Sequence, residues 1–149
     1  MTKHGTILLI ESDENDLLHF RKAFAEADVV HPLQTVDNGE DAVKYLSGAG
    51  VYANRESFPL PFLILLDLKM EGDDGFAVLR WLYDRPGLRK KFTVVTLNSD
   101  NSEVEVQLAY ELGAQSYVVK PRDLKQLVNV VRRLKEYWID LNLLPGDVC

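Results

Sequence analysis

The chain has 149 residues, of which 46% are hydrophobic and 27% charged; this is the balance of one globular domain and excludes a disordered protein. Its formal net charge of -6 argues against nucleic acid as the main partner, because phosphate binding requires a basic surface. No apolar run approaches the roughly 20 residues that span a bilayer, and the N-terminus lacks the apolar segment of a signal peptide, so we expect a cytoplasmic protein without membrane contact.

Five short runs of apolar residues predict β-strands, at 6–10, 33–36, 62–66, 93–97 and 116–119. The third and fourth runs are almost continuously apolar, as is typical of parallel strands covered on both faces. Asn38 and Gly39 close the second run, and we expect the next helix to begin at Gly39. The stretch 48–61 is rich in glycine, proline and polar residues, which predicts one long loop.

Apolar residues recur every three or four positions between the runs, which predicts helices. Gly113 ends one such segment as a left-handed cap does, and Pro121 lies where the last helix can begin. The recurring positions are Leu17, Phe20, Phe24, Ala27, Val78, Leu79, Leu82, Val104, Leu108 and Leu112, and in the last segment Leu124, Leu127, Val131, Leu134, Trp138 and Leu141, which we expect to form its core stripe. Strands that alternate with helices indicate right-handed βαβ units. We therefore predict an α/β fold, a doubly wound sheet of five parallel strands with five helices, in a single domain over 1–149.

Polar residues follow four of the five predicted strands. In an open parallel sheet, ligands bind beyond the carboxyl ends of the strands, near the point where the strand order reverses. The chain delivers acids, an amide or hydroxyl, and one lysine to this edge. These residues are Glu11, Ser12, Asp13, Asp67, Asn98, Ser99 and Lys120.

This set of residues has a chemical interpretation. A carboxylate can attack phosphorus and form an acyl phosphate, and the charge on the peripheral oxygens must then be neutralised by a divalent cation and a fixed cationic side chain. Because Mg²⁺ keeps several waters, one or two carboxylates suffice to hold it, and Glu11 and Asp67 are the candidates. Lys120 is placed to pair with a phosphoryl oxygen. Asn98 or Ser99 can donate a hydrogen bond to another.

Simpler explanations compete with this one. An acid or hydroxyl at a strand end is commonly the N-cap of the following helix, and for Ser12 and Asp13 we favour capping. Asp67 differs because it follows a buried run with no gap, where an unpaired charge is costly. Lys120 follows the fifth strand in the same way. The presence of both at one edge favours a functional site.

At these residues the sequence resembles the receiver domains of two-component response regulators. The matching segments are ILLIESDEND at 7–16, LILLDLKMEGDDG at 63–75, VVTLNSDN at 94–101 and ELGAQSYVVKP at 111–121, in order and at family spacing. The chain looks particularly like the small stand-alone regulators that are partnered with bacterial phytochromes. The resemblance covers nearly the whole chain.

The resemblance implies a flavodoxin-like domain that takes a phosphoryl group from the phosphohistidine of a sensor histidine kinase. Asp67 matches the acceptor, Glu11 one member of the acidic metal-binding pair, and Lys120 the family's lysine. Lys69 falls where a backbone carbonyl binds metal, and Gly75 matches the glycine of the turn after the acceptor strand. Such a protein is a phosphoacceptor rather than an enzyme, with at most self-phosphotransfer and autodephosphorylation of its own.

Several residues depart from the family pattern. Ser12 stands where the second acid of the pair is expected, so magnesium affinity should be weakened unless Asp13 reaches the site. Asn98 replaces the hydroxyl residue that closes over the phosphoryl group, although its amide can still donate. Glu71 replaces a proline. Lys69 brings a cation close to the site, where it could pair with Glu11 and partly stand in for the metal.

The last predicted helix carries a second line of apolar residues beside its core positions, formed by Val130, Tyr137 and Leu144. By the resemblance, Tyr117 is the aromatic residue that reports phosphorylation on a neighbouring face. We expect this region, including Trp138 and the helix and tail from about 135, to bind a partner or a second copy of the chain.

Two hypotheses for function remain. The first is a single-domain response regulator that is phosphorylated on Asp67 by a sensor histidine kinase, with a bacteriophytochrome as a candidate kinase, and that signals by association. The second is a degenerate receiver that interacts with partners independently of phosphorylation. This hypothesis is supported by the departures from the family pattern at Ser12, Glu71 and Asn98. A flavin carrier of this fold would need a Ser/Thr/Gly-rich loop after the first strand, where ESDEND stands instead. A haloacid-dehalogenase-type phosphatase would need a second aspartate two positions after the nucleophile, where this chain has Lys69.

Overall fold

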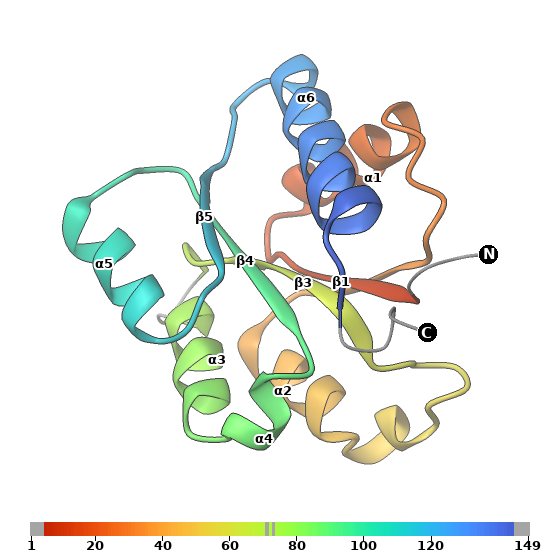
Figure 1. Ribbon diagram of the computed structural model, residues 1–149, viewed down its shortest axis with the longest axis vertical. Helices are drawn as coiled ribbons and strands as arrows, with labels where there is room; N and C mark the ends of the chain where they lie inside the picture. Colours follow the sequence, from red (N-terminus) through yellow and green to blue (C-terminus); the bar gives the residue numbers. More distant parts are fainter. Residues whose placement is uncertain (1–4, 71, 73, 145–149) are drawn as a thin grey trace.

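The computed structural model describes residues 5–70, 72 and 74–144, and they form a parallel sheet flanked by helices (Figure 1). The strands lie in the order β2-β1-β3-β4-β5, and each neighbouring pair is parallel. The strands are β1 (Thr6–Ile10), β2 (Leu33–Val36), β3 (Pro61–Asp67), β4 (Thr93–Asn98) and β5 (Ser116–Val119). The helices are α1 (Glu14–Glu26), α2 (Gly39–Ser47), the 3-10 helix η1 (Gly50–Ala53), α3 (Asp74–Tyr83), α4 (Pro86–Arg89), α5 (Glu103–Glu111), α6 (Leu124–Leu134) and the π-helix η3 (Lys135–Leu141).

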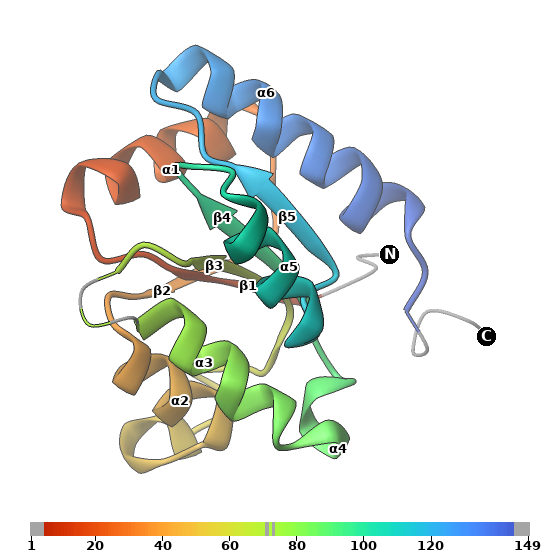
Figure 2. The same ribbon diagram turned by 90° about the vertical axis from the view of Figure 1, so that its left-hand side faces the viewer.

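Alternate side chains of each strand face opposite layers of helices. Leu8 and Ile64 pack towards α2, α3 and α5, whereas Ile7 and Leu63 pack towards α1 and α6. Figure 2 shows α1 and α6 on one side of the sheet and α2 and α3 on the other. The predicted doubly wound α/β fold is therefore confirmed. No helix among the described residues is both long enough and apolar enough to cross a membrane.

The helix boundaries follow local capping chemistry. Asn38 caps α2 by accepting the Asp41 N–H at 2.7 Å, so that helix begins at Gly39 as expected. Gly113 adopts a φ of 98°, the left-handed conformation expected after α5. Val104, one of the recurring apolar positions, lies in α5 but is 76% exposed, because this helix packs through Ala109 further along.

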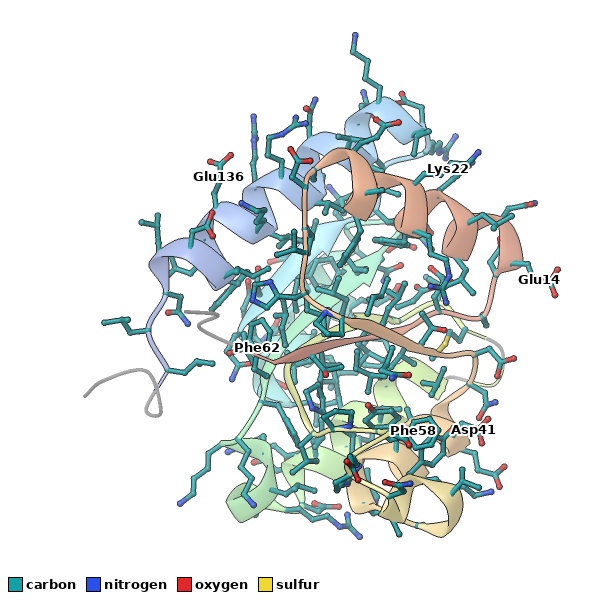
Figure 3. The ribbon with its side chains drawn as sticks, turned by 90° about the vertical axis from the view of Figure 1, so that its right-hand side faces the viewer. Glu14, Lys22, Asp41, Phe58, Phe62 and Glu136 are labelled. Atoms are coloured by element: carbon teal, nitrogen blue, oxygen red, sulfur yellow. The ribbon has the colours of Figure 1, made fainter. Side chains whose placement is uncertain are left out.

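The helices outnumber the five that we expected. Six α-helices lie within the described ranges, and the additional one is the single turn α4. It begins at Pro86, and the fixed φ of proline favours a first helical turn. The predicted long loop also contains η1. There the Tyr52 ring lies 5.0 Å from both the Tyr45 and Phe58 rings, and Arg55 donates to the Tyr45 carbonyl at 2.7 Å. Figure 3 shows Phe58 beside α2.

The last helix also differs from the expectation. It begins at Leu124 rather than near Pro121, because Asp123 caps it by accepting the Gln126 N–H at 2.8 Å. From Lys135 it continues as η3, and the wider π turn rotates the apolar face. Ile139 is consequently buried, whereas the expected core residue Leu141 is 72% exposed.

Candidate functional site

The carboxyl ends of β1, β3 and β5 meet at an open cavity of about 640 Å³. Because β1 lies between β2 and β3, the strand order reverses there, which is where this class of fold binds its ligands. The lining is strongly polar. It consists of Ser12, Asp13, Asp16, Asp37, Asn38, Asp67, Lys69, Met70, Ser99 and Lys120.

Lys120 is the centre of an ion cluster in this cavity. Its Nζ lies 3.1 Å from Glu11 Oε1, 3.2 Å from Asp67 Oδ2 and 2.7 Å from Asp16 Oδ2, and the lysine side chain is only 11% exposed. Burial alone would lower the pKa of Lys120, but the hydrogen bond to Asp16 and the charges of Asp67 and Glu11 raise it above its usual range. The ammonium therefore stays charged and holds three carboxyl groups from β1, α1 and β3 together.

Asp16 is a member of this cluster that the sequence interpretation missed. Its carboxylate makes the shortest of the three contacts to Lys120, from the first turn of α1. Asp13 is the N-cap of α1, and Asp16 lies one turn further on. Asp16 already belonged to the ILLIESDEND segment, but its separation of 104 residues from Lys120 left no local signal of the contact.

Glu11 and Asp67 form a pair of buried acids, 1% and 2% exposed. Burial, a hydrogen bond to Asp67 and the negative charge of Asp67 together raise the pKa of Glu11 to about 8, although Lys120 and the Asp13 N–H oppose the shift. At neutral pH the Glu11 carboxyl therefore keeps its proton and can donate a hydrogen bond to Asp67. Two acids this close, with one ammonium beside them, are also suited to bind a divalent cation in place of that proton.

The backbone around Asp67 is tightly packed. The Lys69 N–H donates to Asp67 Oδ1 at 3.0 Å and fixes the carboxylate at the end of β3. Gly75 lies against this turn, and a Cβ at its position would come within 2.5 Å of the Asp67 carbonyl oxygen and 2.6 Å of Leu68 Cα. Only glycine fits such an approach without displacing backbone, which gives a physical reason for glycine at this point of the chain.

The two residues that follow Glu11 have different roles: one caps α1 and the other lines the cavity. Asp13 accepts the Asp16 N–H at 2.9 Å and is the N-cap of α1, as we favoured. Ser12 is exposed and lines the cavity. Within the described residues, no group of three acidic, histidine or cysteine side chains is arranged so that it could hold a metal ion, and the three acids around Lys120 surround its ammonium instead. Glu11 and Asp67 therefore supply two carboxylates, a set that fits Mg²⁺ with several waters.

Lys69 does not pair with Glu11, and that expectation is wrong. Its ammonium lies 3.2 Å from Glu105 Oε1 and 3.3 Å from Asp100 Oδ2, on the side of α5. These two acids raise the pKa of Lys69, the hydrogen bond to Glu105 contributing most. Lys120 takes the position beside Glu11 instead, because it extends directly into the buried pair from the end of β5. Glu71, the other departure in this loop, lies outside the described residues.

Asn98 and Ser99 have different surroundings. The Asn98 side chain is fully buried and its amide donates to Glu105 Oε2 at 3.0 Å, whereas Ser99 is exposed and lines the cavity. Glu105 was missed by the sequence interpretation. With Ser102 it matches the S-x-x-E pattern of a capping box, yet Ser102 makes no side-chain cap and Glu105 reaches Asn98 and Lys69 instead.

The predicted partner face is partly exposed. Tyr117 is half-buried and its hydroxyl donates to the Asp100 carbonyl at 3.0 Å, while burial raises its pKa. Tyr137 is 51% exposed and packs edge-on against Trp138, with 4.6 Å between the ring centroids. Val130 and Leu144 are half-buried. The region from 135 thus combines core contacts with exposed apolar surface.

Comparison with known proteins identifies the class that this fold and cavity define. Residues 7–132 match the response regulator receiver domain. The chain is 33% identical over 140 residues to response regulator Rcp1 of Synechocystis sp., covering 94% of this chain and 92% of that protein. The Mn²⁺-bound structure of Rcp1 superimposes with a TM-score of 0.82 at 32% identity, covering 95% of this chain and 99% of that one.

Two further solved structures are similar. Response regulator RPA3017, in red light signalling of R. palustris, has a TM-score of 0.88 at 32% identity and covers 95% of this chain and 98% of its own. The phosphorylated cyanobacterial phytochrome response regulator RcpA has a TM-score of 0.85 at 34% identity, covering 95% and 99%. The chain therefore belongs to the response regulator receiver family.

Within that family, the chain is homologous to phytochrome response regulators. It is a signalling protein of two-component systems that works through phosphorylation, and it does not belong to an enzyme family. The competing hypothesis of a degenerate, phosphorylation-independent module is not favoured.

Proposed function

We propose that Asp67 accepts a phosphoryl group from the phosphohistidine of a sensor histidine kinase, and that the phosphorylated chain, acting as a single receiver domain over 1–149, signals by associating with another protein. The observation that carries this proposal is the position of Lys120 Nζ, 3.2 Å from Asp67 Oδ2 in the wall of the cavity. A buried acid is costly without a partner, and here the partner is itself a group that can bind phosphoryl oxygen.

In the transfer step a carboxylate oxygen of Asp67 attacks phosphorus. The new bond joins that oxygen to phosphorus, the bond between phosphorus and the kinase imidazole breaks, and its electron pair returns to the imidazole nitrogen. Negative charge then gathers on the three peripheral oxygens. Lys120 is already held against Asp67 by Glu11 and Asp16, so it neutralises this charge without first being reorganised. Attack by water on the same phosphorus breaks the bond to the Asp67 oxygen, returns the carboxylate and releases inorganic phosphate.

A magnesium ion would be held by the Glu11 and Asp67 carboxylates and by the Lys69 backbone carbonyl. When bound, it would neutralise charge on the transferring group. Ser12 supplies a hydroxyl where a second acid would bind more strongly, so we expect weak affinity; Asp13 is committed to its cap through Oδ1. Ser99 lines the cavity and Asn98 is the buried amide behind it, and we assign both as hydrogen-bond donors to phosphoryl oxygens.

The partner assignment rests on the relatives. Because the similar proteins include phytochrome response regulators, a histidine kinase of the bacteriophytochrome type is the partner that we propose for phosphoryl transfer. We further propose that a second copy binds through the end of α6, η3 and the tail. Tyr137, Leu141 and Leu143 support this because they are 51%, 72% and 63% exposed and lie close together in the chain. Val130, Trp138 and Leu144 would flank them, and Tyr117 would report phosphorylation to this side.

The test of phosphoryl acceptance is incubation with acetyl phosphate and Mg²⁺, followed by intact mass measurement. We expect wild type to gain one phosphoryl group, and Asp67→Asn to gain none. Asp84→Asn, which removes an exposed acid far from the cavity, should label as wild type does. A folded wild-type protein that gains no mass, or an Asp67→Asn variant that labels equally, would refute the assignment.

A further inference from the structure

A second polar cluster lies beside the proposed phosphorylation site, and its two carboxylates, Glu105 and Asp100, have no role in the step above. Glu105, in the first turn of α5, accepts hydrogen bonds from both the Asn98 amide, at 3.0 Å, and the Lys69 ammonium, at 3.2 Å. Asp100 adds a second carboxylate to Lys69 at 3.3 Å, and the Asp100 carbonyl accepts the Tyr117 hydroxyl. The cluster therefore joins the loops after β3 and β4, the start of α5, and β5.

Glu105 accepts hydrogen bonds from two donors near Asp67, namely the Asn98 amide, assigned above to the phosphoryl group, and the Lys69 ammonium. Asn98 is fully buried, so its amide must have an acceptor, and in this structure that acceptor is Glu105 rather than a group in the cavity. Lys69 lines the cavity together with Asp67, yet its ammonium lies at Glu105 and Asp100. Lys120 is the only other lysine in the cavity wall described here, and it is already shared among three acids.

Glu105 also stands at a position where a glutamate commonly caps its own helix. As the fourth residue of the sequence Ser102–Glu103–Val104–Glu105, it stands where a glutamate normally caps the start of its own helix. Ser102 makes no side-chain cap, and its N–H donates to Asp100 at 3.3 Å instead. The carboxylate at 105 is therefore used for contacts across the cluster rather than for its own helix.

We propose that Glu105 is a positioning residue that competes with the phosphoryl group for Asn98 and Lys69. This rests on the proposed phosphorylation of Asp67. A phosphoryl group brings acceptor oxygens and a charge that approaches -2, so on phosphorylation both donors turn from Glu105 to the phosphoryl oxygens. The carboxylate at 105 therefore opposes phosphorylation of Asp67.

The test compares Glu105→Ala with Glu103→Ala. Both variants remove one negative charge from the first turn of α5, but Glu103 is exposed and lies outside the cluster. The initial rate of labelling by acetyl phosphate with Mg²⁺ is measured by intact mass at a limiting donor concentration. We expect Glu105→Ala to label roughly three- to tenfold faster than Glu103→Ala, because charge-assisted hydrogen bonds to a partly exposed group are lost only from the unphosphorylated state.

The same comparison in a chain carrying Asn98→Ala and Lys69→Gln separates competition from a general effect on α5. There the two alanine variants should label at equal rates, since the donors for which Glu105 competes are gone. Equal rates in the otherwise unaltered chain, or a difference that persists without both donors, would overturn the inference while leaving phosphorylation of Asp67 intact. Labelling of none of these proteins would overturn the proposed function and this inference with it.

Discussion

Replacing Glu11 with glutamine tests the buried acid pair through the pH dependence of stability. Glu11 has a pKa of about 8 in the folded protein because it is buried beside Asp67, whereas its ordinary value is 4.5. Between these values the folded state holds a proton that the unfolded chain has released. The free energy of unfolding therefore includes a contribution from Glu11 that is complete below pH 4.5 and is lost as the pH rises towards 8.

The size of the effect follows from the shift. The contribution of Glu11 falls by at most about 1.4 kcal/mol for each pH unit, or about 4 to 5 kcal/mol across the whole window. Glutamine cannot titrate; with its carbonyl towards Lys120 its NH₂ can donate to Asp67, but it no longer accepts the Asp13 N–H that Glu11 Oε2 accepts. The stability of Glu11→Gln relative to wild type should therefore be lowest near pH 5 and should rise towards pH 8.5. Lys120 does not disturb this window, since its raised pKa keeps it charged throughout.

The assay is urea unfolding at pH 5, 7 and 8.5 with EDTA present, followed by the fluorescence of Trp81 and Trp138. Glu14→Gln is the matched control, because Glu14 is exposed at the start of α1, and its stability should follow wild type at each pH. Adding Mg²⁺ at pH 8.5 should stabilise wild type more than Glu11→Gln, which lacks one carboxylate ligand. Stability curves for wild type and Glu11→Gln that stay parallel from pH 5 to 8.5 would refute the buried proton.

Three further predictions concern the turn, the metal and the partner face. Gly75→Ala should lower the free energy of unfolding by about 1 to 3 kcal/mol, since its Cβ would meet the Asp67 carbonyl, whereas Gly87→Ala, with open space around it, should change stability little in the same urea assay. Ser12→Asp should tighten Mg²⁺ binding, measured by titration calorimetry, and an unchanged affinity would contradict the metal site as drawn. Leu141→Ser combined with Tyr137→Ser should weaken self-association in sedimentation experiments if η3 forms the interface; a dimer of unchanged affinity would exclude that surface.

The fold and the main site residues could be predicted because local patterns carry them. Continuous apolar runs followed directly by Asp67 and Asn98 indicated strands covered on both faces, and Lys120 follows the shorter fifth run; parallel strands bring their carboxyl ends to one edge. The same argument accounts for Glu11 at the end of β1. What these patterns describe is each element and its direction, which the sequence alone contains.

Contacts between distant side chains were decided by the tertiary structure. Glu105 matched a local capping pattern, but the buried amide of Asn98 and the ammonium of Lys69 offered stronger partners once the sheet was assembled. Lys69 was drawn to α5 for the same reason, because Lys120 already filled the space beside Glu11. Competition between local and distant partners is settled by three-dimensional proximity, which no spacing in the sequence records.

The sequence by itself thus determined the strands, the polar residues that follow them, and the gathering of acids and a lysine at one edge of the sheet. Only the tertiary structure decided that Asp16 completes the Lys120 cluster, that Glu105 binds Asn98, and that the helix after α6 widens so that Ile139 rather than Leu141 enters the core. The physical reason is that periodicity reports burial along one regular element. Helix widening and charge pairing depend on what the neighbouring elements present.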